Sequence, residues 1–204
     1  MQHHQRPVGL HVLNFLFTLS RYAMKTFLLL SLAAALLAGC KKENADPDGL
    51  VPATQEGKNT GDFLLNGQRW GPQNSPTGTN NPVGANWYGR RLGMELFFYR
   101  YRTATDDSGL NFFLPINNIG TFRLTDAVNP NVLPGSGVKF GIYTMYHPSP
   151  KRQFLTGPVS IGTVTITRFD TIAHIVSGTF EAKLREYQGP DSLSITKGRF
   201  DCTF

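Results

Sequence analysis

The sequence has little cysteine and histidine, and it lacks an apolar run long enough to cross a membrane as a helix. Only 2 Cys and 5 His occur among the 204 residues. So few cysteines exclude the disulfide-rich class of small secreted proteins. The longest apolar run, residues 27–38, is about a dozen residues long, whereas a membrane-spanning helix needs about 20.

The sequence also lacks the motifs that carry common chemistries. It contains no Gly-x-Ser-x-Gly turn, no phosphate-binding loop and no zinc-ligand spacing around His147 or His174. Catalysis needs a nucleophile beside a base, a pair of carboxylates or a metal cluster. The sequence therefore predicts no catalytic residue, no metal and no cofactor.

The net charge is also small once residues 1–39 are set aside. The whole sequence has 20 basic and 14 acidic residues, but three basic residues and no acidic residue precede residue 40. The remainder has 17 basic and 14 acidic residues, a net charge of +3. This mild balance does not predict nucleic-acid binding, which uses a clustered basic face. Weak attraction to anionic glycans or lipid headgroups stays open.

One short apolar segment is present, and it ends at a cysteine. Lys25 precedes the run 27–38, and small residues close it. A basic start, an apolar middle and a small-residue exit are typical of a secretory signal peptide. The exit, Leu37-Ala38-Gly39-Cys40, resembles the lipobox of bacterial lipoproteins, which implies a signal peptide over 24–39 and lipidation at Cys40. The alternatives are a buried helix or an ordinary signal peptide that a cysteine follows by chance.

The flanking segments complete the predicted organisation. Residues 1–23 are interpreted as a gene-model extension upstream of Met24, and a long amino-terminal region of the signal is the alternative. Residues 40–61 are polar, charged and interrupted by Pro and Gly, which predicts a flexible tether. Residues 62–204 are long enough for a proper core and are predicted to form a single β domain.

Alternating apolar and polar residues, with turn residues between the segments, predict an all-β antiparallel fold for that domain. No segment after residue 40 has a helical period, and about eight to ten short strands are expected. A β-sandwich is favoured, with a small closed or partly open β-barrel as the alternative. Asn66-Gly67 predicts a hairpin turn, and residues 70–91 are predicted to be a long loop. Near Gly162 and again near Gly198, the apolar residues switch between odd and even positions. Each switch predicts a β-bulge, because one extra residue would keep the apolar side chains on one face.

Alternation along the last strands also predicts which way three side chains point, inward or outward. Cys202 alternates with Phe200 and Phe204 and is predicted to pack as a small buried side chain, without an intrachain disulfide if Cys40 is lipidated. Glu181 and Asp201 have outward parity and are predicted to be solvated in cross-strand ion pairs rather than to act as a catalytic acid pair.

Aromatic residues are the one feature that points to a binding site. They bracket the long predicted loop and continue on the next strand, and exposed aromatic faces stack on sugars or anchor protein interfaces. The alternative is that both tryptophans close the ends of the core. The candidate ligand-binding residues are Trp70, Trp87, Tyr88, Tyr99 and Tyr101.

Short motifs bracket the chain after residue 40. They are Pro52-Ala53-Thr54-Gln55, Gly57, Asn59, Thr60, Asn66-Gly67, Ser177-Gly178-Thr179-Phe180 and Gly198-Arg199-Phe200-Asp201. This pattern resembles a family of Bacteroidota lipoproteins with a single β-rich domain of unassigned function. The resemblance implies a cell-envelope lipoprotein and carries over no catalytic residue. Gly61-Asp62-Phe63 replaces the Phe-Gly-Cys often found in the family, so a partner for Cys202 is missing.

The leading functional expectation is a lipid-anchored, non-enzymatic envelope protein that binds or scaffolds a glycan or another envelope protein. A glycan-acting hydrolase and a purely structural surface lipoprotein are the alternatives. The expected location is the outer membrane, at the cell surface or on the periplasmic side. Lys42-Glu43 resembles a lysine-acidic signal for surface display, although Asn44 stands where a second acidic residue would strengthen it.

Overall fold

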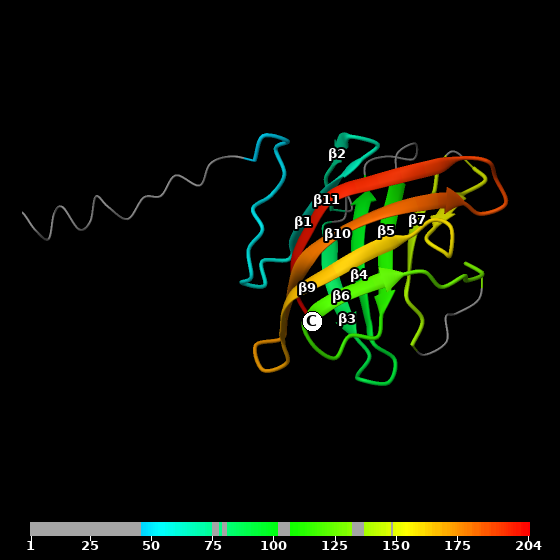
Figure 1. Cartoon of the computed structure of the whole chain (residues 1–204). Coiled ribbons are helices and arrows are strands. Elements are labelled where there is room, and N and C mark those ends of the chain that lie inside the picture. Colours follow the sequence, from blue (N-terminus) through cyan, green and yellow to red (C-terminus); the bar gives the residue numbers. More distant parts are fainter. Residues whose placement is uncertain (1–45, 75–77, 79–80, 102–106, 132–136, 148) are drawn as a thin grey trace, which may run out of the picture. The chain divides into compact units, whose positions relative to one another are not determined.

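A computed structural model describes residues 46–74, 78, 81–101, 107–131, 137–147 and 149–204 (Figure 1). The extension over 1–23, the signal peptide over 24–39 and the lipidation site Cys40 lie outside the described residues, so they stay predictions. Within the described part of the chain, no helix has the length and apolar character to cross a membrane.

The domain is built from antiparallel strands, so the prediction of an all-β antiparallel fold is confirmed. The described residues contain no helix. Val83–Trp87 is a strand within the segment predicted as one long loop, so that prediction is wrong there. The strands are β1 (Thr60–Leu65), β2 (Gln68–Trp70), β3 (Val83–Trp87), β4 (Met94–Tyr101), β5 (Asp107–Leu114), β6 (Gly120–Leu124), β7 (Phe140–Met145), β8 (Arg152–Leu155), β9 (Gly162–Asp170), β10 (Ile175–Glu186) and β11 (Ser192–Thr203).

The strands form one sheet that curls into a half-barrel (Figure 1). Its main order is β2-β1-β11-β10-β8-β7-β5-β4-β3, and β9 and β6 branch from β10. The fork lies along β10, whose residues Ile175–Ala182 pair with β9 and whose residues Arg185 and Glu186 pair with β8. The facing parts of the sheet are consistent with the predicted sandwich. The single curled sheet is consistent with the alternative, a partly open barrel.

Aromatic side chains fill the space between the facing parts of the sheet. Phe180 of β10 lies 4.9 Å from Phe112 and 5.1 Å from Phe98, measured between ring centroids, and so joins the two sides of the core. Phe63 stacks on Trp70 at 4.6 Å and meets Phe180 at 5.6 Å. These contacts follow from the period of two in each strand, which sends alternate residues to one face.

The local turn and bulge predictions had different outcomes. Asn66 and Gly67 form the two-residue turn between β1 and β2 with positive φ values of 50° and 79°, as the hairpin prediction requires. The parity change near Gly198 is also confirmed. The register of β10 with β11 shifts between Phe180 and Ala182, and Lys197 has a φ of 54°.

The bulge predicted at Gly162 is wrong. β9 only begins at Gly162, and its register with β10 shifts farther along the strand, opposite Ser177 and Gly178. Val159 and Ile161, the apolar residues at odd positions, belong to the preceding loop, where Val159 is 81% exposed. The parity change therefore marks the boundary between a loop and a strand.

Residues 46–59, which we name the strap, lie along β1 and β11, so the prediction of a flexible tether is wrong for residues 46–61. The buried carboxylate of Asp201 accepts hydrogen bonds from Thr54 Oγ1 at 2.6 Å and from the Gly57 amide at 2.7 Å. It also accepts bonds from the Glu56 amide at 2.9 Å and from Ser177 Oγ at 2.7 Å. This one side chain therefore satisfies backbone amides of the strap that would otherwise need water as a partner.

Asp201 corrects a second prediction, because it is only 1% exposed rather than solvated. As its parity predicts, Asp201 points away from the core, but the strap covers it. Desolvation alone would raise the pKa of Asp201. The hydrogen bonds from Thr54, the Glu56 amide, Ser177 and the Gly57 amide outweigh that effect and lower the pKa to about 2. Glu181 is exposed as predicted, and it pairs across the sheet with Thr163 rather than with Asp201.

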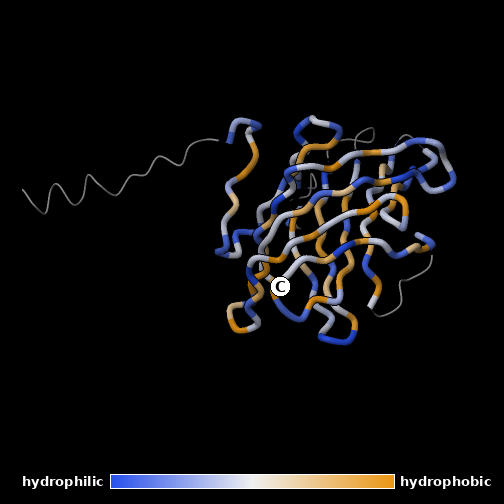
Figure 2. The backbone as a smooth tube through the Cα atoms, viewed as in Figure 1, coloured by the Kyte–Doolittle hydropathy of each residue, from blue (hydrophilic) through white to orange (hydrophobic). Residues whose placement is uncertain are grey.

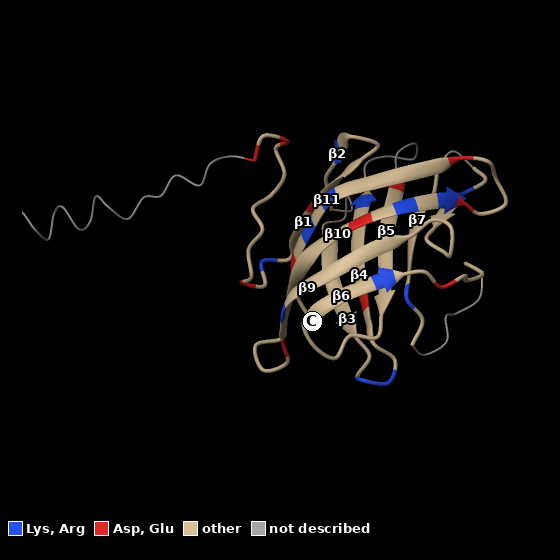
Figure 3. Ribbon diagram, viewed as in Figure 1, with Lys and Arg blue, Asp and Glu red and all other residues tan. Residues whose placement is uncertain are grey.

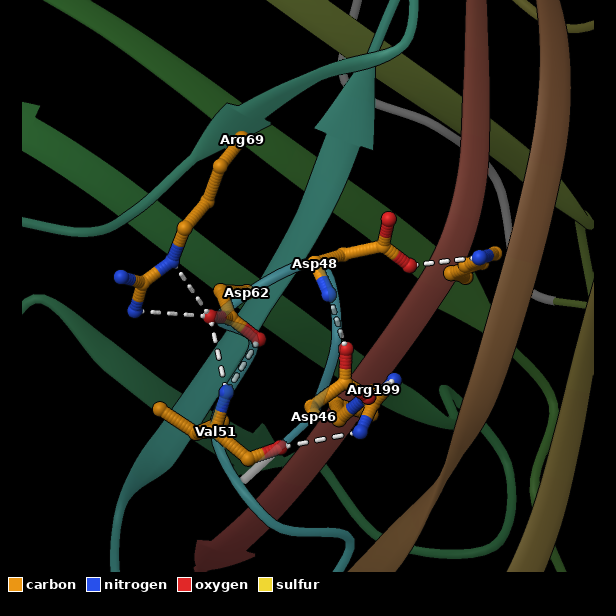
Figure 4. Close-up of polar contacts among 7 residues, drawn as sticks. Asp46, Asp48, Val51, Asp62, Arg69 and Arg199 are labelled. Atoms are coloured by element: carbon orange, nitrogen blue, oxygen red, sulfur yellow. Dashed lines mark hydrogen bonds and ion pairs between the residues drawn. The ribbon is translucent and has the colours of Figure 1, made fainter. Parts of the chain in front are cut away.

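A second buried carboxylate holds the start of the strap (Figure 4). Asp62 accepts a hydrogen bond from the Val51 amide at 3.0 Å and forms an ion pair with Arg69 at 3.1 Å. Arg199 pairs with Asp46 at 2.8 Å and donates to the Val51 carbonyl at 3.1 Å. Burial raises the pKa of Asp62, and these partners offset only part of that effect. Ionic contacts therefore fix the strap from Asp46 onward.

Cys202 behaves as its parity predicts. Its side chain is fully buried in the core and has no disulfide partner among the described residues. Burial raises the pKa of the Cys202 thiol well above its ordinary value. Because the thiolate is the reactive form, the residue is a packing element rather than a reactive thiol.

Candidate functional site

The outer face of β4 carries a row of aromatic rings. Met94, Leu96 and Phe98 point into the core, so the residues between them point outward. Phe97 stacks on Tyr99 with ring centroids 5.5 Å apart and planes 26° apart. The Tyr99 ring lies 5.8 Å from the Tyr101 ring. We name Phe97, Tyr99 and Tyr101 the outer aromatic strip.

Glycines on the neighbouring strands let these rings lie against the sheet. Gly84 of β3 pairs with Phe97, and Gly109 of β5 pairs with Tyr99. A Cβ atom at Gly84 would lie 2.6 Å from Phe97 Cζ, and one at Gly109 would lie 2.6 Å from Tyr99 Cδ1. The absence of both Cβ atoms therefore fixes the ring positions and leaves the strip preformed for binding.

A polar network adjoins the strip. Glu95 accepts hydrogen bonds from Asn111 Nδ2 at 2.8 Å, from the Tyr88 hydroxyl at 2.9 Å and from Asn86 Nδ2 at 3.2 Å. Asn111 Nδ2 also donates to the Tyr99 hydroxyl at 3.1 Å. Burial, and for Tyr88 also the bond to Glu95, raise the pKa of Tyr88 and of Tyr99, so both hydroxyls stay protonated at neutral pH.

This arrangement offers the groups that a binding surface uses. Flat rings offer a stacking surface, and the carboxylate, amide and hydroxyl groups offer hydrogen-bond acceptors and donors beside it. Among the described residues, Glu95 is the one carboxylate of the network, whereas glycoside hydrolysis generally uses a pair. In the same part of the chain, no group of three or more His, Cys, Asp or Glu side chains is placed to hold a metal ion.

The structure brings together three of the five predicted aromatic residues and separates the two tryptophans from them. Tyr88, Tyr99 and Tyr101 lie together on the outer face. Trp70 is buried, and its Nε1 donates to Ser108 Oγ at 3.1 Å. The prediction of an exposed ligand-binding face is therefore wrong for Trp70, because the edge strand β2 turns its last residue into the core.

Trp87 also lies on the core side, between the outward residues Asn86 and Tyr88. It packs against Phe169 at 6.0 Å and against Phe204 at 5.6 Å, so it closes one end of the core. Its buried Nε1 has no hydrogen-bond partner among the described residues. The alternative expectation, in which both tryptophans close the core, describes their positions.

Sequence reasoning missed Phe97, Glu95 and Asn111. A signal was present, because β4 is apolar on both faces, which is unusual for a half-solvated antiparallel strand. The pairing of the rings with Gly84 and Gly109 had no local signal, since it depends on the register between three strands.

A hollow lies on the opposite branch of the sheet. It occupies the outer face of β9, β10 and β11 beside the strap and has a volume of about 560 Å³. Its walls are mainly threonine and charged side chains, and Arg199 among them is already paired with Asp46. This groove offers no exposed ring for stacking and is the weaker candidate. Its lining includes Ala53, Thr163, Thr165, Thr179, Glu181 and Lys197.

No protein-family model matches this sequence, and comparisons with curated proteins and with solved structures find no significant similarity.

Proposed function

We propose that this protein is a lipid-anchored, non-enzymatic binding protein of the cell envelope and that its outer aromatic strip binds a glycan. The observation that carries the proposal is the strip itself, with Phe97 and Tyr99 packed against glycine positions and Glu95 hydrogen-bonded beside them. Ring faces pack on the apolar faces of sugars, and the polar groups beside them bind hydroxyls. A preformed surface lowers the entropy cost of binding.

The anchor is the second part of the proposal, and it is supported by the lipobox-like sequence at Cys40 and by the resemblance to envelope lipoproteins. Lipidation would place the domain at the outer membrane, on its surface or on its periplasmic side. A Cys40→Ser variant is expected to leave the membrane fraction, and mass spectrometry of the native protein is expected to show acyl chains on residue 40.

The strip is tested by affinity gel electrophoresis in xylan, mixed-linkage β-glucan, mannan and peptidoglycan glycan strands. At least one of these glycans is expected to retard the protein. Tyr99→Ala is expected to weaken that retardation at least tenfold, because it removes the central ring, whereas Tyr99→Phe keeps the ring and loses only a few-fold.

Tyr187→Ala is the matched control, since Tyr187 follows β10 and lies outside the strip. Thermal unfolding of each variant verifies that it is folded. Retardation that is equal for Tyr99→Ala and Tyr187→Ala, or absent with every glycan, contradicts glycan binding by the strip.

A further inference from the structure

Three loops lie at one end of the half-barrel (Figure 1). They are residues 88–93 between β3 and β4, 115–119 between β5 and β6, and 171–174 between β9 and β10. Strand register places the first two together, because Met94 pairs with both Trp87 and Leu114. The contacts of Trp87 with Phe169 and Phe204 bring the ends of β9 and β11 to the same end. We name this the loop end.

Each of these loops exposes a large aliphatic side chain. Leu92 is 58% exposed, Ile119 is 62% exposed and Ile172 is 93% exposed. Figure 2 shows hydrophobic stretches next to hydrophilic ones in the loops at this end. Arg90 and Arg91, which are also exposed, precede Leu92 and carry the positive charge of the same loop (Figure 3).

Hydrogen bonds to backbone amides close two of these turns. The Asp170 carboxylate accepts bonds from the Ile172 amide at 3.0 Å and from the Ala173 amide at 2.9 Å. The 88–93 loop is closed by the Tyr88 amide on the Gly93 carbonyl at 2.9 Å and by the Gly93 amide on the Gly89 carbonyl at 2.8 Å. Leu92 and Ile172 therefore lie in turns whose backbone is fixed by hydrogen bonds.

We propose that the loop end docks on the bilayer that carries the anchor, with Leu92, Ile119 and Ile172 in the headgroup region and Arg90 and Arg91 against anionic lipids. Apolar tips beside basic residues are the combination that gives interfacial binding. One contact of this kind is weak, and several contacts together with a lipid anchor become effective because the anchor raises the local concentration.

This contact rests on the proposed anchor for its proximity to the membrane. Six residues lead from Cys40 to Asp46 and span at most about 20 Å. Asp46 is bound to Arg199, which pairs with Thr179. Four residues of β10 separate Thr179 from Ile175 at the loop end, about 13 Å along the strand. Docking at the loop end therefore requires the chain between Cys40 and Asp46 to be extended.

Docking at the loop end would set the direction of the outer aromatic strip. β4 begins at the loop end with Met94 and runs away from it toward Tyr101. The strip would then stand upright from the bilayer, with Glu95 nearest the membrane and Tyr101 farthest from it.

The test places a fluorescent label on Ile172→Cys in the full chain, purified as the native lipoprotein and reconstituted into phosphatidylcholine vesicles with or without phosphatidylglycerol. Cys202 is buried and is not expected to react. Quenchers carried on the lipid chains are expected to quench the label at 172 at least threefold more than a label on Val159→Cys. Val159 is the matched control because it is an exposed aliphatic residue on the β8–β9 loop, away from the loop end.

Adding Arg90→Glu and Arg91→Glu is expected to remove most of the extra quenching at 172 in vesicles that contain phosphatidylglycerol. Equal quenching at 172 and 159 in vesicle-bound protein overturns the docking proposal and leaves the anchor intact. A protein that does not enter vesicles and shows an unmodified Cys40 by mass spectrometry contradicts the anchor instead, so the two failures are distinguishable. If the label at 172 is protected only in whole envelopes, where another protein contacts it, docking on lipid is also overturned.

Discussion

Replacing Asp201 with asparagine is expected to lower the free energy of unfolding by about 3 kcal/mol, because the variant loses charge-assisted hydrogen bonds in a buried site. The Asp201 carboxylate accepts bonds from two side chains and from backbone amides of the strap. An asparagine side chain has one acceptor oxygen, and its amide group would face other donors. The strap should then detach from β11 before the rest of the domain unfolds.

Urea denaturation measures the loss, and limited trypsin digestion after Lys58 reports the release of the strap. Asp191→Asn is the control, because Asp191 is an exposed aspartate that pairs with Arg152 on the surface. Such pairs contribute about 0–1 kcal/mol. A strap that stays resistant to trypsin in Asp201→Asn, or a loss no larger than that of the control, would show that Asp201 does not hold the strap.

The same carboxylate predicts how stability depends on pH. Its pKa is lowered to about 2 in the folded protein, below the ordinary value of 3.8. A carboxyl group with a lowered folded pKa contributes stability above pH about 4, and that contribution of about 2 kcal/mol is lost as the pH falls toward 2. Asp62, whose pKa is raised, acts in the opposite direction. The stability difference between wild type and Asp201→Asn should therefore shrink as the pH falls from 5 to 2.

Replacing Phe180 with alanine is expected to cost about 4 kcal/mol in unfolding free energy, because it opens a cavity at the centre of the core. Phe180 contacts Phe98, Phe112, Phe63 and Phe200, which come from β4, β5, β1 and β11. The ring is thus shared by both sides of the half-barrel, and little can move in to replace it.

Phe180→Leu keeps most of the volume and is expected to cost about 1 kcal/mol. Urea denaturation of both variants gives the comparison. If the alanine variant loses less than about 2 kcal/mol, a typical lower bound for removing a large core side chain, then the facing strands do not share a core through Phe180.

Local pattern was sufficient where a strand has one buried face and a defined turn. The alternation around Phe180 predicted the half-buried face of β10, and Asn66-Gly67 predicted the first hairpin. The parity change near Gly198 predicted the irregularity in β11 because Ile195 and Phe200 are both in the core. The similar change near Gly162 does not mark a bulge, because Val159 is an exposed loop residue rather than part of the core.

The strap could not be predicted from local pattern, because its partners are distant in the chain. Residues 46–59 are too polar to bury much apolar area, which is the usual mark of a tether. They are held instead by the buried carboxylates of Asp62 and Asp201, the second of which follows more than a hundred residues later. Only the register of β1 with β11 brings these two side chains under the strap.

The candidate site shows the same limit. Alternation along β4 places Tyr99 and Tyr101 on one face, so their grouping could be predicted. The burial of Trp70 depends on β2 folding back over the core, where Phe63 stacks on its ring. The contacts of Phe97 and Tyr99 with glycine depend on two strand registers, which no short segment encodes.

Amide chemical-shift mapping tests the proposed glycan contact most directly. The protein would be titrated with an oligosaccharide cut from whichever polysaccharide retards it. If the outer aromatic strip is the binding surface, the shifts concentrate on β3, β4 and β5, from Val83 to Leu114, and disappear in Tyr99→Ala. Shifts concentrated on the groove lined by Thr163, Thr179 and Lys197, or spread evenly over the domain, would contradict glycan binding at the strip.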